Sequence, residues 1–133
     1  MEVTLALLAD YANVSQEGKL NVMGVFDRIW AKKLPVVHPE MWLVFRLEAG
    51  PAERGTEKVI EVKLLDADGN VLQHLKGQFA VPGESAHPIV QIPQILRFTT
   101  VRFEKQGDYA FHILVGGDEK KTVPFSVEQL GEE

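Results

Sequence analysis

Apolar and polar residues alternate with a period of two along most of this chain. The clearest case is the stretch 59–65, in which Ile60, Val62 and Leu64 alternate with Glu61 and Lys63. Successive side chains of a β-strand point to opposite faces, so this pattern predicts a strand with one buried and one solvated face. The same interpretation predicts about eight strands, at residues 3–9, 20–30, 41–48, 59–65, 71–81, 89–104, 109–115 and 123–127.

Glycine and proline residues separate these strands or interrupt them. The sequence "DADGN" at 66–70 predicts a tight hairpin turn, because Asp and Gly accept the positive φ that such turns require. Pro93 cannot donate a ladder hydrogen bond, so we expect it at an edge, a strand start or a bulge. Gly24 is expected to mark a bulge or a close approach of the backbone.

The last third of the chain favours one all-β architecture. Tyr109 follows a glycine-containing corner and begins an alternating apolar strand, as the tyrosine-corner residue does in immunoglobulin-like folds. We therefore predict an all-β, two-sheet antiparallel sandwich with immunoglobulin-like Greek-key connections. A small closed β-barrel is the alternative, because strand patterning does not distinguish closure from stacking. Residues 1–133 are expected to form a single domain, with residues 126–133 as a frayed tail.

Composition and charge narrow the classes of function. The chain has 45% hydrophobic and 25% charged residues, as soluble globular domains do. Its net charge of −5 predicts that nucleic acid is not a partner, since phosphates are held by clustered Lys and Arg. The absence of cysteine excludes a disulfide, a thiolate metal site and a Cys nucleophile.

The beginning of the chain does not resemble a signal peptide. Glu2 stands where positive charge is needed, and the apolar run 3–9 is short. Because about 18 consecutive apolar residues occur nowhere, we predict no membrane partner and a cytoplasmic location.

His112 lies in the middle of an apolar run and raises the question of a chemical role. Tyr109, Phe111, Ile113 and Val115 have one parity and form the inward set. His112 has the other parity, so we expect it to face solvent.

Candidate catalytic and metal-binding groups do not form a recognisable site. The four histidines lack the close His–His spacing of metal sites, the carboxylate pairs lie in expected turns, and Ser85 near His87 lacks a nucleophile elbow. We predict no catalytic residue, no metal and no cofactor, and hence a protein that is not an enzyme.

The chain resembles an uncharacterised bacterial family, a domain of unknown function with small, mostly β members. The likeness lies in "LLADYANVSQEGKLNVMGVFDRIW", in the following "LP" and "LVFRLE", and in "DADGNVL". It weakens after residue 82. The resemblance implies no reaction, cofactor or catalytic residue.

Two strands carry apolar residues on both faces, which motivates the main functional hypothesis. In "VTLALLA" both parities are apolar, and opposite Met41, Leu43 and Phe45 the chain still offers Trp42 and Val44. A contiguous exposed apolar patch usually marks an interface. We expect an interaction module that binds a protein partner or itself, as a homo-oligomer, with a candidate interface at Trp42, Val44, Leu8 and Ala6. The competing expectation is that the loop "KKLPVVHP" covers this face within one chain.

A small hydrolase or sugar-binding protein is the alternative function. It would use a cleft lined by His38, Glu40, Trp42 and His87. This hypothesis requires at least two of the four to converge in a concave pocket.

Overall fold

The computed structural model describes residues 1–131 and is built almost entirely of β-strands. These are β1 (Glu2–Val14), β2 (Leu20–Phe26), β3 (Arg28–Ala31), β4 (Val36–Ala49), β5 (Glu57–Asp66), β6 (Val71–Ala80), β7 (Val90–Phe103), β8 (Gly107–Val115) and β9 (Asp118–Gln129), with one short 3-10 helix, η1 (Pro51–Glu53). The predicted all-β class is confirmed.

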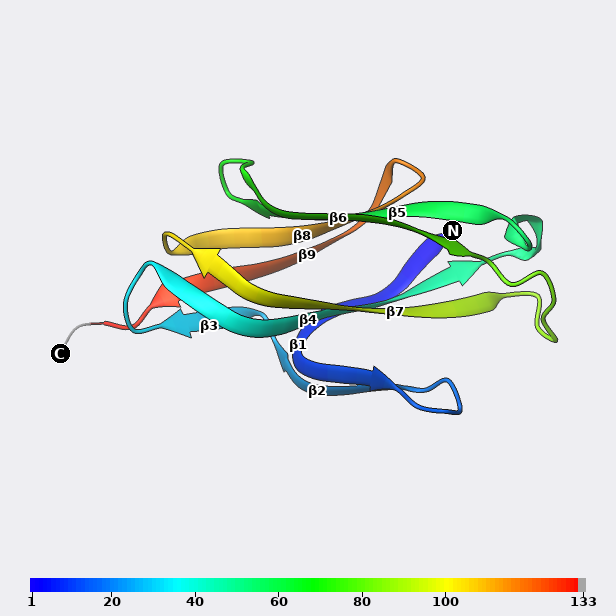
Figure 1. The fold of residues 1–133 in the computed structure, drawn as a ribbon, viewed down its shortest axis with the longest axis horizontal. Helices are drawn as coiled ribbons and strands as arrows, with labels where there is room; N and C mark the ends of the chain where they lie inside the picture. Colours follow the sequence, from blue (N-terminus) through cyan, green and yellow to red (C-terminus); the bar gives the residue numbers. More distant parts are fainter. Residues whose placement is uncertain (132–133) are drawn as a thin grey trace.

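The strands form two sheets that lie one above the other (Figure 1). The four-stranded sheet has the order β2-β1-β4-β7, and the five-stranded sheet has the order β3-β9-β8-β5-β6. Neighbouring strands are antiparallel except for β3 and β9, which run parallel. Within residues 1–131 each sheet ends in two edge strands, so the pairing does not close either sheet into the barrel that was the alternative.

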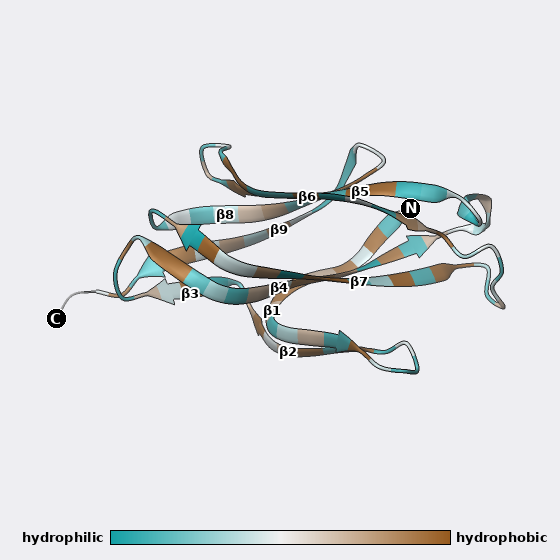
Figure 2. Ribbon diagram, viewed as in Figure 1, coloured by the Kyte–Doolittle hydropathy of each residue, from teal (hydrophilic) through white to brown (hydrophobic). Residues whose placement is uncertain are grey.

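The core lies between the two sheets and contains the inward sets that the alternation predicted. Phe98 of β7 contacts Phe111 of β8 at a ring distance of 5.0 Å, which joins the sheets. Met41, Leu43, Phe45 and Leu47 of β4 are all completely buried. Figure 2 shows the alternating hydrophilic and hydrophobic bands along the strands that produce this arrangement.

The stretch 20–30, expected as one strand, is two strands in different sheets. The chain leaves β2 of the four-stranded sheet at Phe26, passes Asp27, and enters β3 of the five-stranded sheet at Arg28. Residues 1–131 therefore contain nine strands. A change of sheet depends on which distant strand is available for pairing, here β9, and the local pattern does not contain that information.

The predicted frayed tail begins too early in the sequence. Residues Ser126 to Gln129 belong to β9 and pair with β3, and the N–H of Leu130 donates to the carbonyl of Ala31. The parallel partner that holds this segment is almost a hundred residues away in the chain, so the prediction missed it. Residues 132 and 133, the rest of the predicted tail, lie outside the described residues.

Three local predictions are confirmed. Residues 66–70 form the turn between β5 and β6, with Oδ1 of Asp66 accepting hydrogen bonds from the N–H groups of Asp68 and Asn70. Pro93 lies on β7, an edge strand. The hydroxyl of Tyr109 donates to the carbonyl of Lys105 at 2.5 Å, as a tyrosine corner requires.

Candidate functional site

The most distinctive surface is the side of the four-stranded sheet that faces away from the core. Leu8 pairs with the buried Leu43, so side chains of the opposite parity point outward. The register then aligns Leu7, Val44 and Ile95 in one outward row and Ala9, Trp42 and Arg97 in the next. Val25 of β2 lies opposite Ala9. We call the residues Leu7, Ala9, Val25, Trp42, Val44 and Ile95 the apolar outer face.

Trp42 is held in place at the centre of this surface. Its indole Nε1 donates to Oε1 of Glu40 at 2.7 Å, and the guanidinium of Arg97 pairs with the same carboxylate at 3.2 Å. Arg97 also lies over the Trp42 ring, 5.9 Å from its centroid, and Tyr11 meets the ring edge-on at 5.1 Å. These contacts fix the orientation of Trp42 before any partner binds, which lowers the entropic cost of binding through it.

Exposure varies across the apolar outer face. Val44 and Ala9 are completely covered, although they point away from the core. Val25 is 61% exposed, and Met23 beside it on β2 is 67% exposed. Trp42, Leu7 and Ile95 are half-buried. Val44 therefore supports the surface from beneath, while Val25 and Trp42 are available for contact.

Leu8 and Ala6 do not share this face with Trp42 and Val44, and their predicted grouping is wrong. Leu8 is 1% exposed and belongs to the core, and Ala6 pairs with the buried Phe45. The run Val3–Ala9 is apolar at both parities, so the pattern could not tell which parity faces inward. The outward residues of β1 are Leu7 and Ala9 instead.

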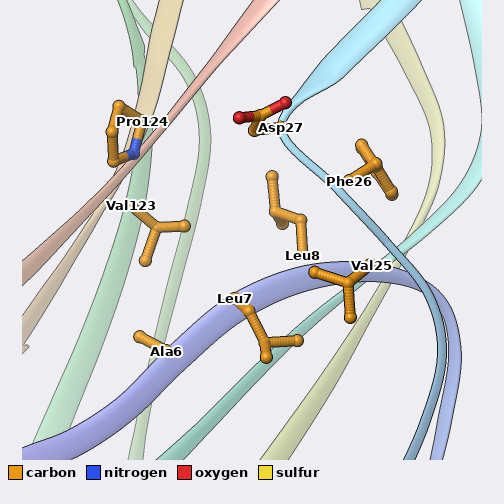
Figure 3. Close-up of a pocket in the computed structure, with 8 residues that line it drawn as sticks. All are labelled: Ala6, Leu7, Leu8, Val25, Phe26, Asp27, Val123 and Pro124. Carbon is orange, nitrogen blue, oxygen red and sulfur yellow. The ribbon is translucent and has the colours of Figure 1, made fainter.

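A cavity of about 390 Å³ adjoins the apolar outer face at the side of the two sheets. It opens where residues 2–7 of β1 pair with β4 only, since β2 pairs with β1 from Leu8 onward. Figure 3 shows its lining, which comes from β1, from the end of β2 and from β9: Ala6, Leu7, Leu8, Val25, Phe26, Asp27, Val123 and Pro124. Because Leu7 and Val25 belong to both, the cavity and the face are continuous.

The four residues of the alternative cleft do not come together. Glu40 and Trp42 are hydrogen-bonded on the outer face, but His38 lines a different cavity with the core-side residues Phe26 and Ile29. His87 lies in the loop before Val90, which pairs with the last residue of β4. His38 is near the first residue of β4, so His87 lies at the opposite end of a 14-residue strand.

The separation of His38 from Glu40 has a local cause. Across Pro39 the inward side changes parity, because both Met41 and His38 pair with buried residues of β7, namely Phe98 and Val101. The irregularity lies opposite Thr100, whose φ is +55°.

A polar row crosses the outward side of the five-stranded sheet at His74, Lys63 and His112. His112 is on this side, as predicted, and pairs with Glu119. His74 pairs with Glu61 at 2.9 Å. The hydrogen bond from His112 holds the pKa of Glu119 below its usual value, and the bond from His74 does the same for the pKa of Glu61.

Two structural searches within residues 1–131 give negative results. No group of three or more His, Cys, Asp or Glu side chains is placed to hold a metal ion. No helix in this range has the length and apolar character needed to cross a membrane.

Comparison with known proteins identifies the family. Residues 4–128 match a family of unknown function, DUF6941. The chain belongs to this family. The resemblance to an uncharacterised family is thereby confirmed, and the match to DUF6941 extends well past residue 82, where the sequence likeness seemed to weaken. No curated protein matches the sequence.

Among solved structures, the chain is similar to a Pseudomonas fluorescens alkylpurine DNA glycosylase, AlkC, bound to DNA that contains an abasic site analog. The identity is 17% and the TM-score is 0.49, over 77% of this chain and 27% of that one. This chain thus spans about a quarter of the length of that protein.

This finding contradicts the exclusion of nucleic-acid partners that was drawn from the net charge, and the exclusion is withdrawn. Net charge averages over the whole surface, so it does not decide what one local region binds. At a TM-score of 0.49 the likeness supports no statement about what this chain itself binds.

Proposed function

We propose that the protein is a non-enzymatic interaction module that self-associates through the apolar outer face. The observation that carries the proposal is the outward row of Leu7, Val44 and Ile95 beside a fixed Trp42, with Val25 61% exposed. Aromatic residues in such positions dominate the energetics of interfaces. Apolar surface of this kind on a soluble protein marks a binding site.

The charges around the face suit a second copy of the same chain. Its polar surroundings contain two arginines, Arg46 and Arg97, and three glutamates, Glu2, Glu40 and Glu48. A two-fold interface brings the same patch together from both subunits, so it must be complementary to itself. A border that carries both signs can meet this requirement, whereas a border of one sign would repel its copy.

The immunoglobulin-like sandwich is part of this proposal, and so is the cytoplasmic location. The Tyr109 corner and the parallel pairing of β3 with β9 support the sandwich. Tyr109→Phe should lower the free energy of unfolding by about 1 kcal/mol, because it removes a largely buried hydrogen bond. A loss indistinguishable from zero in urea unfolding would remove the main support for the sandwich.

Light scattering on a matched pair of variants tests self-association. Val25 and Val71 are both exposed valines on strands, at 61% and 55%, but Val71 lies on β6 of the other sheet. Wild type and Val71→Glu should have twice the mass of the chain at high micromolar concentration. Val25→Glu and Trp42→Lys should be folded monomers. A wild type that stays monomeric at every concentration would end the proposal.

A further inference from the structure

A second, smaller cavity lies on the core side of the β1–β2 hairpin. It has a volume of about 280 Å³ and is lined by Asp10, Phe26, Arg28, Ile29, Trp30 and His38. Figure 1 shows the hairpin bending away from the five-stranded sheet beside β3. Asp10 has the opposite parity to Ala9 and Tyr11, so this cavity is separate from the apolar outer face and its role does not depend on self-association.

Asp10 is positioned by the absence of a side chain at Gly24. A Cβ atom on Gly24 would lie 2.5 Å from Oδ2 of Asp10, and the φ of +70° at Gly24 favours glycine. The group that lies close to Gly24 is therefore the side chain of Asp10 rather than another stretch of backbone, and the missing Cβ makes room for its carboxylate. Among residues 1–131 no hydrogen bond or ion pair satisfies that carboxylate.

His38 also lines this cavity. Its Nε2 is buried and has no partner within the described chain. Burial lowers the pKa of His38, against opposing contributions from Asp10 and from a backbone hydrogen bond with Glu40, so the ring is neutral near pH 7.

The remaining lining provides aromatic surface and little free positive charge. The Phe26 ring lies 6.2 Å from the His38 ring. Arg28 is over the indole of Trp30 at 5.5 Å, and its Nε is 3.7 Å from a carboxylate oxygen of Glu128. Arg28 is therefore paired with Glu128 rather than with Asp10. Arg28 itself shows that the Trp30 ring accepts a guanidinium.

We infer that this cavity binds an organic cation with N–H donors, an ammonium or a guanidinium group. The Asp10 carboxylate is exposed in the wall of the cavity and has no protein partner among residues 1–131, so the ligand donates hydrogen bonds to it. The carboxylate supplies the opposite charge, and Phe26 and Trp30 supply the aromatic walls. The volume of about 280 Å³ suits one such group with a short stem.

An NMR titration tests this site with methylguanidinium, using neutral methylurea as its isostere. Trp30 and Trp42 give two indole signals, which Trp30→Phe assigns. Methylguanidinium should shift the Trp30 indole and His38 ring signals in a saturable way, and methylurea should not. Asp10→Asn should weaken binding about tenfold or more, because it removes a charge-assisted bond. Asp108→Asn, at an exposed aspartate on β8, should leave binding unchanged.

The same titration distinguishes the source of the cation. A blocked tripeptide with a central arginine that binds at least as tightly as methylguanidinium assigns the site to a protein side chain. Binding of the tripeptide that is about tenfold weaker assigns it to a free small molecule. Equal responses to methylguanidinium and methylurea, or equal binding by wild type and Asp10→Asn, would overturn the inference.

Discussion

The outward sides of the two sheets differ, although both sheets bury their other side in one core. On the five-stranded sheet Lys63 lies between His74 and His112, and both histidines pair with glutamates. On the four-stranded sheet the inner strand β4 presents Val44, which is completely covered. A sheet that only has to fold needs one apolar side. The second apolar side of the four-stranded sheet therefore requires its own explanation, and a binding surface supplies one.

Placing a negative charge on an inner strand of each outward side, β4 or β5, should give the largest difference between them. Val44→Asp would put an unpaired carboxylate into a fully covered position and should cost about 3 kcal/mol or more in the free energy of unfolding. Lys63→Asp stays in a polar row with two histidines and should cost less than about 1 kcal/mol. Urea unfolding of both variants measures the difference. Equal costs would mean that the two sides are not physically distinct.

Removing one hydrogen bond from the apolar side should have a smaller effect. Trp42→Phe keeps a ring beside Tyr11 and Arg97 but deletes the bond from Nε1 to Glu40, so stability should fall by about 1 kcal/mol. Unfolding is best measured at low micromolar concentration, where the monomer dominates. A loss as large as that of Val44→Asp would show that Trp42 is part of the fold rather than a surface fixed for binding.

The stability contributed by the pair His112–Glu119 on the five-stranded sheet should decrease in acid. The pKa of Glu119 is lowered in the folded state by its bond from His112, so between the two pKa values the unfolded chain binds more protons. This contribution is complete above the unfolded value, 4.5, and is lost as pH falls below it. Glu119→Gln should therefore lose less stability than wild type between pH 5 and pH 3. If the stability of wild type and of Glu119→Gln changed with pH in parallel, Glu119 would not contribute to the pH dependence.

Protonation of His38 should reduce the stability of the fold in a higher pH range than protonation of Glu119 does. The folded pKa of His38 is lowered by burial, so stability is complete above the unfolded value, 6.5, and declines as pH falls below it. His38→Gln should flatten the decline between pH 7 and pH 5 in urea midpoints. A wild type whose midpoint is constant over that range would contradict the burial of the imidazole.

The sequence predicted the parts of this molecule in which one strand face is polar. The stretch 59–65, the turn at 66–70 and the face of His112 follow from local pattern and turn chemistry. The assignment failed at Leu8 and Ala6, because "VTLALLA" is apolar at both parities and only pairing with β4 shows which side is buried.

Non-local contacts account for the other differences. The division of 20–30 into β2 and β3 and the pairing of Ser126–Gln129 both depend on β3 meeting β9. The cavity at Asp10 was missed, although Gly24 had been recognised as a close approach. The residue that lies against Gly24 is Asp10, on the neighbouring strand β1. The pattern of β1 alone does not show that these two residues face each other.

The central claim is that the apolar outer face meets a second copy, and the accessibility of Trp42 tests it most directly. In a Trp30→Phe background Trp42 is the one tryptophan of the sequence, so acrylamide quenching reports on it alone. Quenching should decrease as the concentration rises from low to high micromolar, and it should be independent of concentration when Val25→Glu is added. If Trp42 were quenched equally at all concentrations, with and without Val25→Glu, the result would contradict the claim.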